Sequence, residues 1–206
     1  YAYPERVSER LIGQLAELPQ LCHYLDIPLQ HAHPAVLRRM GRPSDVDRTR
    51  RLVERLRDAV PDIAIRSTFI VGFPGESQEE FARLLDFLSE MEFDHVGVFP
   101  YSREEGTRAA QLPGQVPERV KQRRYAAAME LQQEISLRRN QSQVGRVLPL
   151  LIEGSGDDNL LVGRCYRDAP EVDGLVVTRG DGRIGQMVDV RITGALEYDL
   201  IGELLP

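Results

Sequence analysis

Thr68-Phe69-Ile70-Val71-Gly72-Phe73-Pro74-Gly75-Glu76 is the stretch of the sequence that decides the fold. Its β-branched and aromatic first half predicts a buried strand, and the Gly-Phe-Pro-Gly segment predicts a tight loop at the end of that strand. Ser77 and Glu80 follow at the spacing of a capping box, and apolar residues then recur at helical spacing from Phe81 to Met91. The predicted unit is a strand, a loop whose glycines let a ligand approach the backbone, and a helix. An ordinary connection between a strand and a helix is the alternative interpretation of this loop.

Strands and helices alternate along the first part of the chain. The pattern predicts strands that end near residue 3 and that span residues 23–31, 63–71 and 95–102. Helices are predicted after Pro4, over residues 35–40, 45–59 and 78–91, and from Pro117 to about residue 143. Such alternation indicates βαβ units and a parallel sheet, with ligands expected at the carboxyl ends of the strands. Gln30, Gly72 and Tyr101 lie at the carboxyl ends of three of these strands, so we expect them at one edge of the sheet.

The sequence pattern changes at Gly145. Short apolar runs, separated by glycine and aspartate, then predict five strands at residues 147–152, 160–164, 175–178, 188–192 and 200–204. Five short strands indicate a small closed barrel. We therefore expect two domains, residues 1–144 and 145–206, and we expect the exposed edge of the sheet to make the first domain the weaker one.

Composition limits the classes of protein that the chain can belong to. The 206 residues are 42% hydrophobic, and no apolar run approaches the roughly 20 residues of a membrane span. Cys22 and Cys165 lie far apart in the sequence, which predicts a reducing, cytoplasmic location and neither a disulfide framework nor a metal cluster. We expect both cysteines to be buried.

Acidic and basic residues are unevenly distributed. Residues 1–144 contain 21 acidic and 20 basic residues, whereas residues 145–206 contain 11 acidic and 6 basic residues. The predicted barrel therefore carries most of the net negative charge of the chain. A barrel of this charge repels nucleic acid, so we expect no direct binding of nucleic acid.

Four segments together carry a resemblance to a known family. They are Asp26-Ile27-Pro28-Leu29-Gln30-His31-Ala32, residues 66–76, Tyr101-Ser102-Arg103-Glu104-Glu105-Gly106-Thr107 and Asp168-Ala169-Pro170-Glu171-Val172-Asp173-Gly174. Jointly they resemble the radical-SAM methylthiotransferases, over essentially the whole chain. The Gln-His-Ala, Glu-Glu and Ala-Pro-Glu-Val-Asp-Gly runs are similar to the RimO branch, which modifies an aspartate of a small-subunit ribosomal protein. The resemblance implies the back portion of an α/β partial (β/α) barrel of radical-SAM type, followed by a five-stranded all-β TRAM barrel of OB-like type.

The resemblance also implies cofactors. In the intact enzyme, one [4Fe-4S] cluster binds S-adenosyl-L-methionine and cleaves it reductively to a radical, which takes a hydrogen from the substrate carbon. A second [4Fe-4S] cluster supplies the sulfur of the methylthio group. The cysteine motifs that bind these clusters are missing from the 206 residues. We therefore expect no cluster, no metal ligand and no activity on this polypeptide alone, and we assign no catalytic acid or base. A non-enzymatic remnant that only docks the substrate is the alternative.

The resemblance places six candidate contacts of S-adenosyl-L-methionine: Gln30, Arg66, Val71, Gly72, Phe99 and Tyr101. The first two offer polar groups, and the arginine suits a carboxylate. The next two are placed to line the adenine, and the two aromatic residues are placed to pack near it. In the alternative interpretation, the arginine pairs with an acidic residue of the protein surface and Phe99 is an ordinary core residue.

The loop at residues 167–174 concentrates three carboxylates, those of Asp168, Glu171 and Asp173, and is stiffened by Pro170. We expect this loop to be the docking surface for a basic ribosomal protein, and through it for the ribosome. A solvated turn is the alternative. A tRNA-adenosine methylthiotransferase is the rival function, but it calls for a basic barrel, and the charge of residues 145–206 argues against it.

Overall fold

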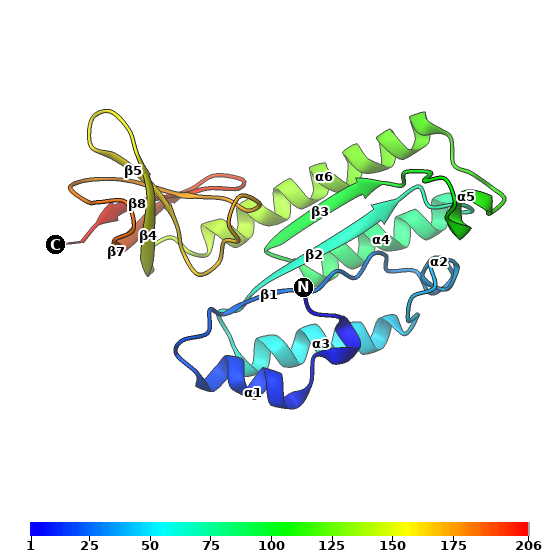
Figure 1. Ribbon diagram of the computed structural model, residues 1–206, viewed down its shortest axis with the longest axis horizontal. Helices are drawn as coiled ribbons and strands as arrows, with labels where there is room; N and C mark the ends of the chain where they lie inside the picture. Colours follow the sequence, from blue (N-terminus) through cyan, green and yellow to red (C-terminus); the bar gives the residue numbers. More distant parts are fainter. Residues whose placement is uncertain (206) are drawn as a thin grey trace.

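The computed structural model describes residues 1–205, which form an α/β unit followed by a β-barrel (Figure 1). The elements of the α/β unit are η1 (Pro4–Arg6), α1 (Glu9–Glu17), β1 (Tyr24–Asp26), α2 (Pro34–Arg39), α3 (Val46–Ala59), β2 (Ala64–Val71), α4 (Gln78–Met91), β3 (His95–Pro100), α5 (Arg108–Gln111) and α6 (Glu118–Gln141). The three strands are parallel, in the order β1-β2-β3. The predicted alternation of strands and helices and the predicted parallel sheet are confirmed. No helix in this described part of the chain is long and apolar enough to cross a membrane.

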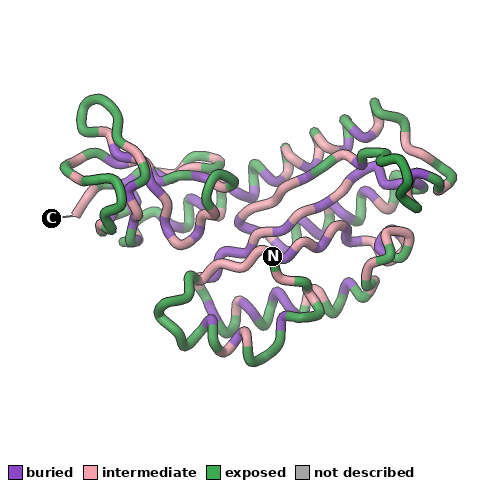
Figure 2. The backbone as a smooth tube through the Cα atoms, in the orientation of Figure 1, coloured by how far each residue is buried: buried purple, intermediate pink, exposed green. Residues whose placement is uncertain are grey.

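Strand β2 is the centre of the sheet and has two different faces. Ile65, Ser67, Phe69 and Val71 are buried, whereas the residues between them are only half-buried. The buried face packs against the helices, where the ring of Phe69 lies 6.4 Å from the ring of Phe87 on α4. Figure 2 shows the buried positions gathered between the sheet and the helices, while the outer turns of the helices are exposed. The opposite face of the sheet is therefore open.

Strand β1 is shorter than the sequence pattern predicts. It pairs with β2 only over Tyr24–Asp26, and the chain returns to β2 through a single bridge between Gln30 and Phe69. Pro28 lies in the gap and has no N–H to give to a ladder. The predicted strand at residues 1–3 is also absent from the described residues, where Ala2 makes one backbone hydrogen bond to Asp26, 2.7 Å from nitrogen to oxygen.

Helix α6 packs against the sheet through a face that carries both apolar and polar residues. Of its apolar residues, Ala128 and Ile135 are buried, and Ala127 and Leu131 are partly buried against the same core. The other buried residues of the helix are Lys121, Arg124, Gln132, Ser136 and Asn140. Their hydrogen bonds explain how they are buried: the amide of Gln132, for example, donates to the carbonyl of Phe93 at 3.0 Å.

The second unit is a closed five-stranded barrel with the strand order β4-β5-β6-β8-β7, as predicted. Its strands are β4 (Val147–Ser155), β5 (Leu160–Arg164), β6 (Val176–Arg179), β7 (Met187–Ala195) and β8 (Leu200–Leu204). Alternate residues point inward, so that Leu148, Leu150, Val190 and Ile192 fill the interior. Helix α6 ends at Gln141, so the predicted domain boundary falls between the last helix and the first strand of the barrel.

The barrel docks onto the end of the sheet where β2 and β3 begin. Arg167, in the loop between β5 and β6, donates from Nη2 to the carboxylate of Asp94 at 2.8 Å. Arg139 of α6 donates to the same carboxylate at 3.1 Å, and the N–H of Ile65 donates to it at 3.0 Å. The Asp94 side chain is 0% exposed. Burial opposes its ionisation, but the two guanidinium groups and the N–H outweigh burial, so the pKa of Asp94 lies below its ordinary value.

Candidate functional site

The structure brings Gln30, Gly72 and Tyr101 together where the strands end. The N–H of Gln30 donates to the carbonyl of Thr68 at 2.8 Å, and the carbonyl of Gln30 accepts from the N–H of the residue two positions later in β2, also at 2.8 Å. The N–H of Tyr101 donates to the carbonyl of Val71 at 2.9 Å. Gln30 and Gly72 both have positive φ, 71° and 73°. This edge, where β2 and β3 end and the segment after β1 returns to β2 at Gln30, is the candidate functional site.

A buried carboxylate holds the turn after β2. The Glu76 side chain is 0% exposed and accepts hydrogen bonds from the backbone N–H of Gly72 and from Nη1 of Arg124, the latter at 2.7 Å. His31 Nε2 lies 3.0 Å from the same carboxylate, and Arg124 also donates to the Glu76 carbonyl at 3.0 Å. A buried carboxylate needs such partners, because removing it from water is costly. The cluster therefore ties β2, the loop after β1 and α6 together at the strand ends.

Lys121, the only lysine of the sequence, packs over the same turn. Lys121 Nζ donates to the carbonyl of Tyr101 at 2.8 Å and lies 3.2 Å from a carboxylate oxygen of Glu118. Its aliphatic stem lies where a Cβ at Gly72 would be. Two features therefore require glycine at position 72: its positive φ and the close approach of the Lys121 stem.

An apolar surface lies beside the turn. Phe99 is 54% exposed, so the interpretation of Phe99 as a core residue is wrong. It pairs in register with Ile70, which is half-buried on the open face of β2. Tyr101 packs edge-to-face on Phe73, with ring centroids 5.2 Å apart, and its buried hydroxyl has no hydrogen-bond partner among the described residues. Exposed apolar atoms next to a turn and an unpaired hydroxyl suit a flat ligand with polar substituents.

Two of the six predicted cofactor contacts need correction. The side chain of Val71 is fully buried on the helix-facing side of β2, so it cannot line a ligand on the open face; Ile70 is the β2 residue that can. Arg66 lies at the opposite end of the sheet, opposite the first residue of β3. Five residues of strand, about 16 Å, separate it from the end of β2. It pairs there with Asp26 at 3.3 Å and with Asp173, whose side chains are 15% and 2% exposed. The alternative of an ion pair is therefore closer to the structure than a ligand contact, but the partners are not residues of the surface.

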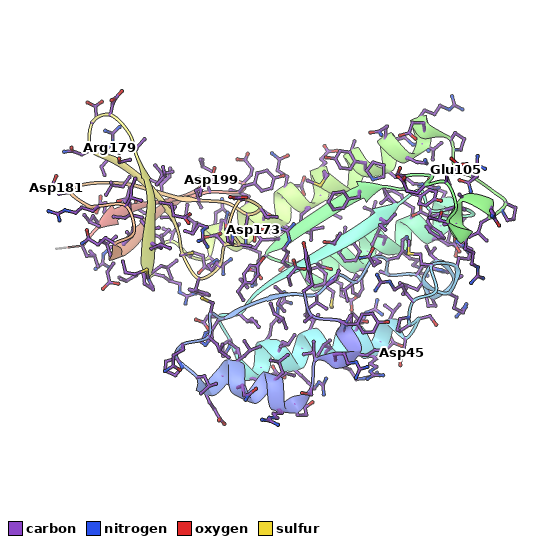
Figure 3. The ribbon with its side chains drawn as sticks, in the orientation of Figure 1. Asp45, Glu105, Asp173, Arg179, Asp181 and Asp199 are labelled. Carbon is purple, nitrogen blue, oxygen red and sulfur yellow. The ribbon has the colours of Figure 1, made fainter. Side chains whose placement is uncertain are left out.

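The predicted docking loop is not an exposed acidic surface. The carboxylate of Asp173 accepts from the hydroxyl of Tyr24 at 2.8 Å and pairs with Arg66, so it belongs to the junction of the two units (Figure 3). Asp168 accepts a hydrogen bond from the N–H of Cys165 at 3.3 Å. Burial raises the pKa of Asp168 above its ordinary value, although the thiol of Cys165 and the neighbouring His95 and Arg167 act in the opposite direction. Of the three acidic residues of the loop, only Glu171 is exposed. The loop fastens the barrel to the sheet.

The two cysteines have different environments. Cys165 is buried as expected, but Cys22 is exposed, so the prediction for Cys22 is wrong. Burial, together with the neighbouring Asp168 carboxylate, raises the pKa of the Cys165 thiol far above its ordinary value. Among residues 1–205, no group of three or more His, Cys, Asp or Glu side chains is arranged to hold a metal ion.

Sequence reasoning did not assign His31, Glu76, Lys121 or Arg124 to the site. Glu76 and His31 lie within two of the segments that carry the family resemblance, but the sequence does not show that their side chains pair. Lys121 and Arg124 lie in a highly charged helix whose composition is typical of a solvated surface. The one usable signal is their spacing of three residues, which places both on one face of α6.

Comparisons with known proteins support this description. The model of the radical SAM superfamily matches residues 3–88, and that of the TRAM domain matches residues 144–205. Coproporphyrinogen III oxidase (HemN) from Escherichia coli, a radical SAM enzyme, shares the fold with a TM-score of 0.54 and 19% identity, over 66% of this chain and 31% of that chain.

Closely similar relatives bear the name ribosomal protein uS12 methylthiotransferase RimO. The relative from Roseiflexus sp. (strain RS-1) is 61% identical over 100% of this chain and 44% of its own length, and that from Chloroflexus aurantiacus is 58% identical over 100% of this chain and 46% of its own length. The chain thus spans a little under half the length of these relatives. It belongs to the radical-SAM methylthiotransferase family of RimO type, with a TRAM domain as its second unit.

Proposed function

We propose that this chain is part of a radical-SAM enzyme that adds a methylthio group to the β-carbon of an aspartate in ribosomal protein uS12. The observation that carries the proposal is identity of 61% over the whole chain to a relative of that name. The geometry adds support, because Gln30, Gly72 and Tyr101 meet at the strand ends, where a sheet of this kind binds its ligands. A ribosomal substrate also supports a cytoplasmic location of the enzyme.

The residues of the strand-end edge fit S-adenosyl-L-methionine. When bound with a [4Fe-4S] cluster in the intact enzyme, this cofactor supplies the radical chemistry, and a second cluster supplies sulfur. We assign the adenine to the apolar surface formed by Ile70 and Phe99, and a polar substituent to the unpaired hydroxyl of Tyr101. The Gly72 turn then presents its backbone to the ligand. Glu76 and Lys121 act on the ligand only by holding that turn in place.

The test uses the whole protein, with the cysteine motifs that its relatives imply, reconstituted under anaerobic conditions. Incubation with uS12, S-adenosyl-L-methionine and a reductant should add the mass of one methylthio group, less one hydrogen, to a single aspartate of uS12, as measured by peptide mass spectrometry. Modification of a tRNA adenosine, with uS12 unchanged, would overturn the proposal in favour of the tRNA branch.

A variant with a matched control tests the assigned site. Phe99→Ala removes an exposed ring, so it should leave folding intact while it raises the KM for S-adenosyl-L-methionine by about tenfold, the effect of losing a ligand contact of roughly 1.4 kcal/mol. Val172→Ala removes an exposed apolar side chain of the barrel unit, 58% exposed, and should leave that KM unchanged. Equal kinetics for the two variants would place the adenine elsewhere.

A further inference from the structure

One edge of the parallel sheet has no strand beside it. Among residues 1–205, β3 pairs only with β2, so the other edge of β3 is free (Figure 1). The N–H of Asp94, just before β3, donates to the carbonyl of Ile65 in β2 at 3.1 Å. Backbone groups of successive strand residues point to opposite sides, so every second residue after Asp94 also faces β2. The N–H and C=O groups of Gly97 and Phe99 therefore point toward the free edge.

The backbone groups at this edge are accessible and unpaired. Gly97 is half-buried, and because it has no side chain, its exposed surface is that of the backbone itself. In the part of the chain that the structure describes, no hydrogen bond reaches the outward N–H or C=O groups of Gly97 or Phe99. Side chains of α6 donate to carbonyls before and after β3, those of Phe93 and Tyr101, but not to these two residues. The middle of β3 is therefore a template for a further strand.

The free edge lies next to the surface assigned to the adenine. Phe99 is 54% exposed on the open face, and its ring lies over Gly97, where a Cβ would be 3.2 Å from the ring. A strand added to β3 would lie about 4.8 Å away from it. Side chains that lie opposite each other in neighbouring strands point to the same face, so the added residue beside Phe99 would project over the open face. That residue would stand next to a cofactor packed on Ile70 and Phe99.

We infer that the free edge of β3, at Gly97 and Phe99, binds an extended segment of the substrate protein as an additional strand. An extended polypeptide presents N–H and C=O groups at the spacing that such an edge needs, as in other cases of strand addition. That the segment comes from uS12 and carries the aspartate to be modified rests on the proposed function. The contacts are made with the backbone of the segment, so they fix the position of the aspartate without requiring particular side chains around it.

The charge around the edge disfavours a nucleic acid as its occupant. His95, the first residue of β3, lies 3.6 Å from the carboxylate of Asp173. Arg66 neutralises that carboxylate, but the two barrel segments on this side, residues 171–175 and 196–199, include three further acidic residues and no basic one (Figure 3). A phosphate backbone along β3 would meet these carboxylates, whereas the backbone of a polypeptide is neutral.

Amide exchange in the 206-residue chain tests whether the edge is free and whether a peptide covers it. The amides of Gly97 and Phe99 should exchange with water faster than those of Val96 and Val98, which face β2, as measured residue by residue by NMR. The probes are synthetic peptides of about ten residues, each centred on one aspartate of uS12, and the peptide that binds most tightly is used. Its binding should slow exchange at Gly97 and Phe99 by more than about tenfold and so abolish the alternation. Alternation that persists in the complex, or that is absent from the free chain, would overturn the inference, as would the failure of every peptide to bind.

Two N-methylated forms of that peptide provide a matched pair. One form carries N-methyl groups on the odd-numbered residues and the other on the even-numbered residues, so the side chains and the net charge are the same in both. Only every second N–H of an added strand faces β3, so one form should lose affinity by more than about tenfold and the other by less than about twofold. Equal losses in the two forms, or no loss in either, would refute strand addition.

The two proposals can fail independently. If the whole enzyme modifies uS12 but the alternation of exchange at β3 persists in the peptide complex, strand addition falls and the proposed function stands. If the peptide abolishes the alternation but the whole enzyme leaves uS12 unmodified, the proposed function falls and strand addition stands as the way in which the chain binds that peptide.

Discussion

Replacing Arg167 by methionine removes one partner of the buried Asp94 carboxylate. The side chains of Arg167 and Asp94 are 3% and 0% exposed, so the remaining carboxylate stays buried. It keeps the guanidinium of Arg139 at 3.1 Å and the N–H of Ile65 at 3.0 Å. Breaking a buried ion pair costs about 3–5 kcal/mol, and because these two partners remain we expect the lower end, about 3 kcal/mol of the free energy of unfolding.

The pH dependence of stability gives a second readout for the same variant. The pKa of Asp94 in the folded protein lies below its ordinary value, so its stabilisation is present above the unfolded pKa of about 3.9 and is lost as the pH falls through the folded pKa. The wild type should therefore lose stability below about pH 4. Without Arg167 the pKa of Asp94 rises toward its unfolded value, and this acid dependence should become shallower.

Urea unfolding of the 206-residue chain measures both effects. Arg138→Met, which breaks an ion pair with Glu92 whose side chains are 52% and 41% exposed, is the control and should cost less than about 1 kcal/mol. Limited proteolysis should cut residues 165–174 faster in the Arg167 variant, because the loop loses its anchor. A loss of stability equal to that of the control, or an unchanged acid dependence, would refute our account of the junction.

Three further predictions concern single residues. Gly72→Ala should lower the free energy of unfolding in urea by about 1–3 kcal/mol more than Gly41→Ala. Both glycines have positive φ, but only Gly72 has a side chain packed over it. Equal losses of unfolding free energy in the two variants would contradict this. Burial, and then the hydrogen bond to Asp173, raise the pKa of Tyr24 in the folded protein. The stabilisation that Tyr24 provides is therefore present below its unfolded pKa of about 10 and is lost as the pH rises above it. The melting temperatures of the wild type and of Tyr24→Phe should converge above about pH 10, and a constant difference between them would count against this. Anaerobic reconstitution of the 206-residue chain should yield no stoichiometric iron or sulfide, because its two cysteines cannot supply the thiolates of a cluster; a stoichiometric cluster would contradict this.

The position of the candidate site could be predicted from the sequence, but not the direction of each side chain. Strand ends are readable because each strand stops at glycine, proline or polar residues, and the sheet geometry then brings those ends together. Phe69, Ile70 and Val71 are all apolar, so the alternation that separates the two faces of a strand is not visible there. The assignment of Val71 instead of Ile70 follows from that ambiguity.

Long-range ion pairs explain the other errors. Asp173 pairs with Arg66, 107 positions away, so its burial depends on how the two units meet and not on the composition of its own loop. Helix α6 buries arginine, lysine and glutamine because specific carbonyls and carboxylates meet them, and polar residues at helical spacing look the same on a solvated face. Charge patterns alone cannot distinguish these two cases.

Helix α6 fixes the distance between the strand-end turn and the barrel. Lys121, near its start, touches the strand-end turn, and the amide of Asn140, near its end, donates to a carbonyl of the barrel at 3.1 Å. The nineteen residue steps between them rise about 29 Å along one straight element. A polypeptide held by the barrel therefore needs about nine residues of extended chain to bring a side chain to the turn at Gly72. Any polypeptide that contacts both the barrel and the turn at Gly72 needs at least that length between its two points of contact.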